Sequence, residues 1–334
     1  MSHRYALLIA PSSNRVYAGE APRLTEAELS VFGSAVLGAR PRDLARLQLG
    51  GVTYVGFVTD EPLTDRDLAY LSNVSSAYAL FAVEDGELLR PLPVTPLARY
   101  DDDLITIPKY AGKTNEQFTR LLLNVTVLGS DRAGELLDRR LVVLDPLCGR
   151  GTTLNQALMY GYDAIGIEVD GGHVDAYSAF LRTWLRRKRL KHTVELNPVR
   201  QEHKRIGRRL VATLAPTKAA YRNGDTQRVT VLHADTVQAR RLLRAGCCDV
   251  IVTDTPYGIA HRARTVELLK AAVPGWVELL RRGGAIGLSF NTHVVGRDEV
   301  AALLAGAGLT VVATPDFSHW VDQGITRDLI VARR

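Results

Sequence analysis

From residue 141 to the end of the chain, short apolar segments alternate with amphipathic ones, and this alternation restricts the fold more than any other feature. Leu141-Val-Val-Leu and Ala164-Ile-Gly-Ile-Glu-Val predict two strands, with a helix from Thr152 to Tyr160 between them. Further strands are expected at 229–233, 249–253, 285–290, 309–313 and 327–332. Short strands that alternate with helices are typical of a doubly wound parallel sheet, so we expect an α/β domain here.

The first hundred residues have a different pattern. Runs rich in β-branched and aromatic residues predict strands at 4–10, 52–58, 79–83 and 87–94. Thr25 with Glu28, and Thr64 with Asp67, have the spacing of capping boxes and predict two helix starts. This order favours a small α+β module of ferredoxin-like type over residues 1–104.

A proline-rich and acidic stretch, residues 91–103, predicts a linker to a larger domain at 105–334. Near the start of that domain, Thr114 or Asn115 can cap a helix. The apolar face of this helix is expected to comprise Phe118, Leu121, Leu122 and Val125.

Length and composition exclude several classes of protein. A chain of 334 residues suggests about two domains, and no apolar run approaches the roughly 20 residues that span a bilayer. Only three cysteines are present, without the spacing of a disulfide framework or a metal site. We expect a soluble cytoplasmic protein that uses no metal.

Positive charge is concentrated in one part of the chain. Between Arg182 and Arg228, fourteen Lys or Arg residues face three acidic ones, a net charge of +11, whereas the whole chain carries +6. A charged, solvated helix explains such a stretch equally well. The position of the stretch inside the α/β domain, however, favours a polyanionic partner. The basic insertion at about 186–228 therefore predicts contacts with substrate phosphates, to which Arg186, Arg187 and Lys188 are assigned.

A glycine turn follows the strand that ends at Asp145. Gly149 and Gly151 allow the backbone to turn sharply and to approach a ligand, and the next helix offers unpaired N–H groups. A phosphate-binding P-loop is excluded because its Lys is missing, and the dinucleotide fingerprint is incomplete because position 154 is Leu.

Carboxylates follow the next strands as well. Glu168 ends the second strand, where it can accept hydrogen bonds from ribose hydroxyls, and Asp170 is its alternative. Asp235 follows the third strand, where an adenine amino group could be recognised. The full set expected to bind a nucleoside cofactor is Asp145, Cys148, Gly149, Gly151, Thr152, Thr153, Glu168, Asp170, Ala234 and Asp235.

Two motifs together resemble a known family. Asp145-Pro-Leu-Cys-Gly-Arg-Gly-Thr-Thr is similar to the first motif of methyltransferases that modify amino groups of nucleic acid bases, and Asp254-Thr-Pro-Tyr-Gly to their D/N-P-P-Y motif. The segment from Lys113 and the ending His319-Trp-Val-Asp-Gln-Gly-Ile-Thr-Arg-Asp resemble the Trm-type tRNA guanine-N2 methyltransferases. The resemblance covers about residues 105–334. It implies a Rossmann-like fold, S-adenosylmethionine as cofactor and RNA, in particular tRNA, as partner.

The second motif explains how an exocyclic amine could react. Its lone pair is delocalised into the base, so Asp254 and a backbone carbonyl of Thr255 or Pro256 are expected to accept its hydrogen bonds. Tyr257 offers a ring for stacking, worth about 1–3 kcal/mol. Arg262, shortly after the motif, is placed to contact a substrate phosphate.

The chain departs from this family in two ways. Thr255 stands where Pro is usual, and residues 1–104 are too short to hold both a ferredoxin-like module and a THUMP module. Three alternatives stay open: a methyltransferase acting on a peptide, protein side chain or metabolite, a DNA amino-methyltransferase, and a nucleic-acid-binding protein with a vestigial cofactor site.

Overall fold

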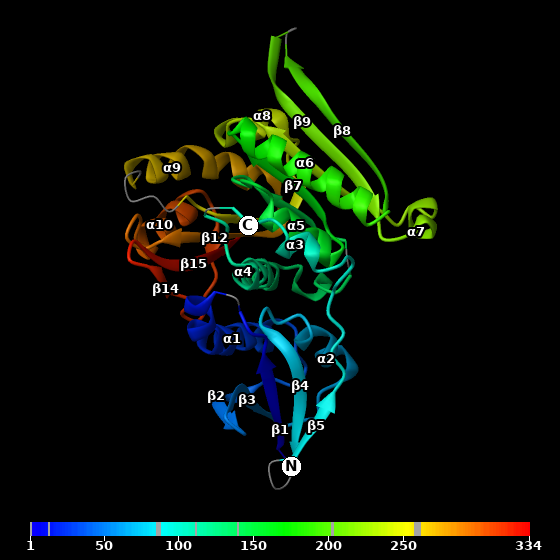
Figure 1. Ribbon diagram of the computed structural model, residues 1–334. Helices are drawn as coiled ribbons and strands as arrows, with labels where there is room; N and C mark the ends of the chain where they lie inside the picture. The colour runs from blue at the N-terminus through cyan, green and yellow to red at the C-terminus, as the bar shows by residue number, and fades with distance from the viewer. Residues whose placement is uncertain are drawn as a thin grey trace.

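The computed structural model describes most of the chain as two β-sheets with their helices (Figure 1). The described residues are 2–12, 14–84, 88–110, 112–138, 140–201, 204–256 and 262–334, with the side chains at 200, 201, 204–206 and 262–264 left aside. Within them, no helix is long and apolar enough to cross a membrane.

The N-terminal sheet has the predicted ferredoxin-like arrangement with one added strand. Its order is β2 (Arg42–Leu49), β3 (Val52–Thr59), β1 (His3–Ile9), β4 (Ala77–Glu84) and β5 (Leu88–Leu92), and all neighbours are antiparallel. Helix α1 (Arg15–Ala35) joins β1 to β2, and α2 (Asp65–Leu71) joins β3 to β4. Each crossover skips one strand, which gives the split β-α-β pattern of that fold.

One of the two expected helix starts is wrong. The capping box of Thr64 and Asp67 is present at α2. Thr25, in contrast, lies inside α1, whose N-cap is Asn14, and its hydroxyl donates to the carbonyl of Ala21 (2.6 Å). Glu28 turns into the core instead of capping.

The second sheet has five parallel strands at its centre. In spatial order these are β12 (Leu280–Asn291), β11 (Cys248–Asp254), β6 (Val142–Asp145), β7 (Asp163–Glu168) and β10 (Gln227–His233). Antiparallel β15 (Ile325–Arg333) pairs with β12 and carries β13 (Thr310–Val311) and β14 (His319–Asp322). The predicted doubly wound α/β fold is therefore confirmed.

Helices cover both faces of this sheet. One apolar cluster includes α4 (Glu116–Leu128), α5 (Thr152–Tyr160) and α6 (Gly171–Arg187), and the other includes α8 (Ala239–Leu242), α9 (Arg262–Leu279) and α10 (Arg297–Gly306). Asn115 caps α4, and the four residues expected on its apolar face are all buried. Short helices α3 (Asp103–Thr106) and α7 (Lys218–Arg222) and the 3-10 turns Ala133–Glu135 and Thr236–Gln238 complete the chain.

Much of the basic insertion forms a long antiparallel hairpin, for which the sequence analysis predicted no structure. Strands β8 (Lys191–Gln201) and β9 (Lys204–Ala215) extend the sheet beyond β10. Because His233, the last residue of β10, pairs with Arg208, the residues of β9 before 208 extend past the edge where β10 ends. Figure 1 shows this hairpin projecting from the top of the molecule.

The N-terminal module packs against the face formed by α4. Glu28 on α1 accepts hydrogen bonds from the side chain of Asn124 on α4 (2.7 Å) and from the amide of Ser75 (2.9 Å), and it is fully buried. Arg23 on α1 donates to the carbonyl of Asp316, before β14 (3.1 Å). A single apolar cluster runs from the N-terminal sheet to the large sheet.

Candidate active site

A cavity of about 910 Å³ opens at the carboxyl edge of the parallel strands. Its lining includes the ends of β6, β7, β10 and β11 and the segment before α4. In doubly wound sheets ligands bind at this edge, and the volume is within the range of small-molecule sites, roughly 300–1,000 Å³. Of the predicted cofactor residues, these line it: Asp145, Cys148, Gly149, Thr152, Thr153, Glu168, Ala234 and Asp235.

The two glycines of the turn have different roles. Gly149 has a positive φ of 52°, lines the cavity and has no protein atom within 4 Å of the place where a Cβ would be. Gly151, with a φ of 84°, would bring a Cβ to 2.4 Å from the ring of Tyr177, and it is not part of the lining. Gly149 thus leaves room for a ligand, whereas Gly151 leaves room for a packed ring.

Glu168 connects the end of β7 to the glycine turn. Its Oε2 accepts from the amide of Gly149 (2.8 Å) and its Oε1 from the amide of Asp170 (2.7 Å). Each carboxylate oxygen has a further lone pair, so hydroxyl donors can still be accepted. Asp170 itself caps α6 through the amide of Gly172 (2.7 Å) and lies outside the lining.

Asp145 is buried beneath the turn. Its Oδ1 accepts from the amide of Leu147 (3.1 Å) and the hydroxyl of Thr253 (2.9 Å), and only 3% of the residue is exposed. Burial raises the pKa of this carboxyl to about 7, although these hydrogen bonds oppose the shift. Asp145 therefore holds the turn to the end of β11.

Cys148 and Asp235 also line this part of the cavity. Cys148 is buried, and a Cβ at Gly166 would lie 2.6 Å from its Sγ, so the thiol fills space above β7. Burial raises the pKa of this thiol, which opposes a nucleophilic role. Asp235 is exposed at the end of β10 and accepts from the amide of Val237 (3.0 Å).

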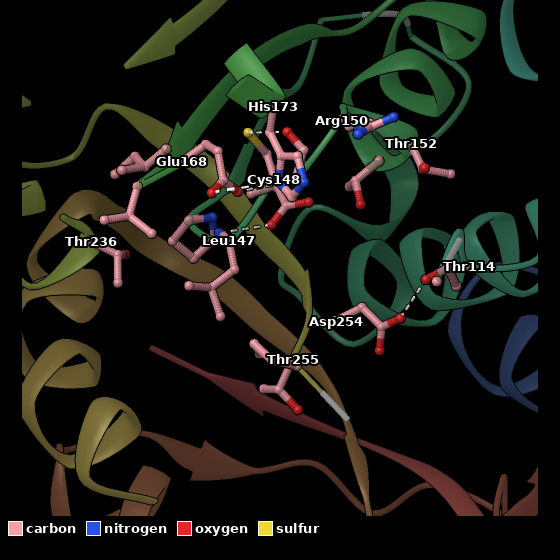
Figure 2. Close-up of a pocket in the computed structure, with 18 of the residues that line it drawn as sticks. Thr114, Leu147, Cys148, Arg150, Thr152, Glu168, His173, Thr236, Asp254 and Thr255 are labelled. Carbon is pink, nitrogen blue, oxygen red and sulfur yellow. Dashed lines mark hydrogen bonds and ion pairs between the residues drawn. The ribbon is translucent and has the colours of Figure 1, made fainter. Parts of the chain in front are cut away.

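Asp254, the expected catalytic carboxylate, lies at the end of β11 between two other segments. Its Oδ2 accepts from the hydroxyl of Thr114, before α4 (2.6 Å), and lies 3.8 Å from a guanidinium nitrogen of Arg327 on β15. Burial raises the pKa of Asp254, and the charge of Arg327 and the hydrogen bond from Thr114 oppose this shift. Figure 2 shows Thr114 and Asp254 facing each other.

Arg327 is held in place by packing against the ring of Phe118. Its guanidinium lies 4.4 Å from the centroid of the Phe118 ring, and its side chain is 6% exposed. The sequence analysis did not assign a role to Thr114 at the site or to Arg327. Both lie in the segments that carry the family resemblance, which is the one signal that could have found them.

The unusual Thr255 has a structural explanation. Its amide and its hydroxyl both donate to the carbonyl of Ser289 on β12 (3.0 and 3.1 Å). Proline could form neither bond. In this chain two hydrogen bonds to the neighbouring strand fix the turn, whereas in the D/N-P-P-Y motif the proline ring fixes it. Pro256 lines the cavity, whereas Tyr257 and the side chain of Arg262 lie outside the described residues.

The predicted phosphate contacts lie far from the cavity. Arg186, Arg187 and Lys188 are at the end of α6, about 24 Å along the helix from its start at the cavity edge. Lys188 also forms ion pairs with Asp101 (2.7 Å) and Asp103 (2.6 Å). These residues cannot contact a base held near Asp254, and contacts with a distant part of a large substrate stay a prediction.

Other cations lie at the cavity instead. Lys109 and Arg150 are part of its lining. The guanidinium of Arg150 lies 5.1 Å from the ring centroid of Tyr110, whose hydroxyl forms a hydrogen bond with Thr152 (2.7 Å). The sequence analysis did not assign Lys109, Tyr110 or Arg150 to the site. Among the described side chains, no group of His, Cys, Asp or Glu has an arrangement that could hold a metal.

Comparisons with known proteins find only distant structural similarity. No family model matches the chain, and no curated protein matches it. Similar solved structures include TrmN from Thermus thermophilus (16% identity, 85% of this chain and 57% of that chain, TM-score 0.40) and a TehB-like SAM-dependent methyltransferase from Corynebacterium glutamicum (14%, 58% and 80%, 0.35). An rRNA methylase from Streptococcus thermophilus is also similar, with 10% identity over 67% of this chain and 99% of that chain and a TM-score of 0.39. At these identities and TM-scores, the likeness carries no argument about activity.

Proposed function

We propose that this chain is an S-adenosylmethionine-dependent methyltransferase that methylates an exocyclic amino nitrogen of a nucleic acid base. One observation carries the proposal: Asp254 and the glycine turn with its acidic residues line one cavity at the carboxyl edge of the sheet. A half-buried carboxylate next to a nucleoside-sized site suits the activation of a weakly nucleophilic amine.

The residues around the turn fit the proposed cofactor. The free space beside Gly149 accommodates a ligand that a Cβ would exclude, and Glu168 and Asp235 offer acceptors for ribose hydroxyls and an adenine amino group. Lys109 and Arg150 offer positive charge to a carboxylate. S-adenosylmethionine would supply a methyl group on a positively charged sulfur.

Asp254 would activate the amine and accept its proton. Its carboxylate can accept a hydrogen bond from the N–H, which favours a localised lone pair on the nitrogen. As the nitrogen gains a methyl group it loses a proton, for which the same carboxylate is an acceptor. Thr114 and Arg327 hold the carboxylate in one orientation, and positioning of this kind can supply roughly 7–11 kcal/mol of the barrier reduction.

We further propose that the substrate is RNA and that the amine is guanine N2 in tRNA. The resemblance of the motifs supports this assignment, as does the basic hairpin β8–β9, which extends past the edge of the sheet where the cavity opens. Phosphate contacts give such binding a strong salt dependence.

The decisive experiment is methyl transfer from labelled S-adenosylmethionine to RNA, DNA and protein fractions from cells without this protein, followed by nucleoside analysis. We expect label in N2-methylguanosine from RNA. Asp254→Ala should abolish transfer while the chain still binds S-adenosylhomocysteine, and Asp170→Asn, which preserves a helix cap, should keep both properties. Label in protein or small molecules alone would refute the RNA assignment, and failure to bind S-adenosylhomocysteine would refute the cofactor.

A further inference from the structure

Thr114 and Arg327, which orient Asp254, do not belong to the strand that carries it. Thr114 comes from the segment before α4 (2.6 Å), and Arg327 comes from β15 (3.8 Å). Helix α1 of the N-terminal module packs against both α4 and β14, the strand paired with β15 (Figure 1). The N-terminal module therefore contacts the elements next to each of these two partners.

A series of buried side chains joins α1 to Arg327. The ring of Tyr17 on α1 packs edge-on against His319 on β14 (centroids 6.2 Å apart), and His319 packs against Phe118 on α4 (5.2 Å). The guanidinium of Arg327 lies 4.4 Å from the centroid of the Phe118 ring. All four residues are at most 5% exposed. Because a protein interior is close-packed, the position of each ring limits that of the next, so Tyr17 limits where Arg327 can lie.

His319 links this series to the backbone of β15. It lies directly opposite Arg327 in the β14–β15 ladder, and its Nδ1–H donates to the carbonyl of Phe317 (2.9 Å). Burial lowers the pKa of His319 to about 4, so near pH 7 the ring is neutral and does not repel the guanidinium. Arg23 on α1 donates to the carbonyl of Ser318, the residue before His319. Helix α1 thus holds both the ring of His319 and the chain that leads to it.

The other partner, Thr114, is reached through the start of α4. Asn115 caps α4 with its Oδ1 (3.1 Å), and its Nδ2 donates to the hydroxyl oxygen of Ser12, just before α1 (3.2 Å). Gln117 donates to the carbonyl of Ala10 in the same segment (3.1 Å). The segment between β1 and α1 thus fixes the backbone from which the hydroxyl of Thr114 reaches the carboxylate.

Close placement matters for a carboxylate that is to orient an amine and accept its proton. A displacement of about 1 Å at a reacting group can cost on the order of a hundredfold in rate. Side chains that must be placed this closely depend on packed and hydrogen-bonded neighbours. Here the neighbours that hold Thr114 and Arg327 include side chains of the N-terminal module.

We propose that the N-terminal module positions the active site, by acting on Asp254 through Thr114 and Arg327. Its positioning residues are Ser12, Tyr17 and Arg23. The proposal rests on the proposed function for the role of Asp254 as a base. The placement of its carboxylate, however, can be measured without methyl transfer.

The test follows the titration of Asp254 in the full chain by NMR of labelled aspartate carboxyl carbons, with Asp254→Asn to assign the signal. Among the described side chains, the charged groups that act on Asp254 are Arg327 and Asp145. The charge of Arg327 and the hydrogen bond from Thr114 lower the pKa of Asp254 and thereby oppose the effect of burial. Misplacing either partner should therefore raise this pKa further.

Two variants misplace one partner each. Tyr17→Leu removes a ring from the series, and Ser12→Ala removes the acceptor of Asn115 from a loop, where folding should be unharmed. Both should raise the pKa of Asp254. Tyr17→Phe keeps the ring and should titrate as the wild type does. Phe32→Leu is the matched control, because it also removes a buried ring from α1, but about 22 Å further along the helix.

A double variant separates positioning from a loss of packing. In the Arg327→Met background, Tyr17→Leu should cause no further change in the titration of Asp254, because Tyr17 acts through Arg327. In methyl transfer, kcat of Tyr17→Leu should fall about tenfold to a hundredfold, while the affinity for S-adenosylhomocysteine is kept.

An Asp254 pKa that is unchanged in both Tyr17→Leu and Ser12→Ala overturns the proposal, as does an equal shift in Phe32→Leu. A shift by Tyr17→Leu that persists in Arg327→Met also overturns it. If the variants titrate as expected but the wild-type chain transfers no methyl group, the positioning of Asp254 is supported and the proposed function is refuted.

Discussion

The free protein should become more stable at neutral and alkaline pH when Asp145 is replaced by Asn. Burial raises the pKa of this carboxyl from 3.8 to about 7. A carboxyl whose pKa is higher in the folded state binds more protons there than in the unfolded chain, so its contribution to stability falls as the pH rises from about 4 to about 7. Three pKa units of 1.4 kcal/mol each make this loss about 4 kcal/mol.

Asparagine does not ionise, and its Oδ1 can still accept from the amide of Leu147 and the hydroxyl of Thr253. At pH 5 most of the loss has not yet occurred, whereas at pH 8 it is complete. The stability of Asp145→Asn relative to wild type should therefore increase by about 2–3 kcal/mol between these pH values. In a chain of 334 residues that is a shift in Tm of about 3–4 °C.

The assay is thermal unfolding of the cofactor-free protein at both pH values. Asp235→Asn is the matched control, because Asp235 is exposed, caps a turn at the end of β10 and can be replaced by another good cap. Its effect should be the same at pH 5 and pH 8. If the difference between Asp145→Asn and wild type is also independent of pH, then burial of an ionisable carboxyl does not govern stability at this position and the reasoning fails.

Three further predictions concern the site. Arg327→Met removes the charge that lowers the pKa of Asp254, so the acid limb of kcat/KM should move to higher pH; an unchanged limb would contradict the ion pair. Gly151→Ala should lower the Tm markedly, because its Cβ would lie 2.4 Å from the Tyr177 ring at a φ that alanine disfavours, and adding Tyr177→Leu should restore part of the loss. Glu168→Gln should weaken S-adenosylhomocysteine binding at least about tenfold in calorimetry, because an amide NH₂ would face a backbone donor; equal affinity would remove this carboxylate from the cofactor site.

That several residues expected to bind the cofactor would lie on one cavity could be predicted from a simple rule. Parallel strands end at one edge, so residues at the ends of successive strands come together whatever the length of chain between them. Gly149, Glu168, Asp235 and Asp254 follow four strands that were each visible as short apolar runs, and the structure places all four on one cavity.

Contacts that depend on packing between distant segments could not be predicted in this way. Thr114 reaches Asp254 across 140 positions of the chain, and Arg327 does so because antiparallel β15 lies beside β12. The hairpin β8–β9 was missed for another reason. Its positive charge led to a prediction of phosphate contacts and of no strands, although Val194 and Leu196 alternate with polar residues as a strand requires. Thr25 failed as a helix start because the capping spacing also occurs in the middle of a helix, where the hydroxyl bonds to the preceding turn.

The buried carboxylate of Glu28 has a consequence for how the molecule unfolds. It binds α1 to Ser75 and to Asn124, and Asn124 in turn accepts from the hydroxyl of Tyr160 on α5 (2.7 Å). Moving the two sheets apart would break these buried hydrogen bonds and expose the apolar cluster that joins the sheets, which costs more than breaking exposed contacts. The joint between the sheets therefore cannot act as a hinge, and both sheets should melt in one transition and share the same slow amide exchange.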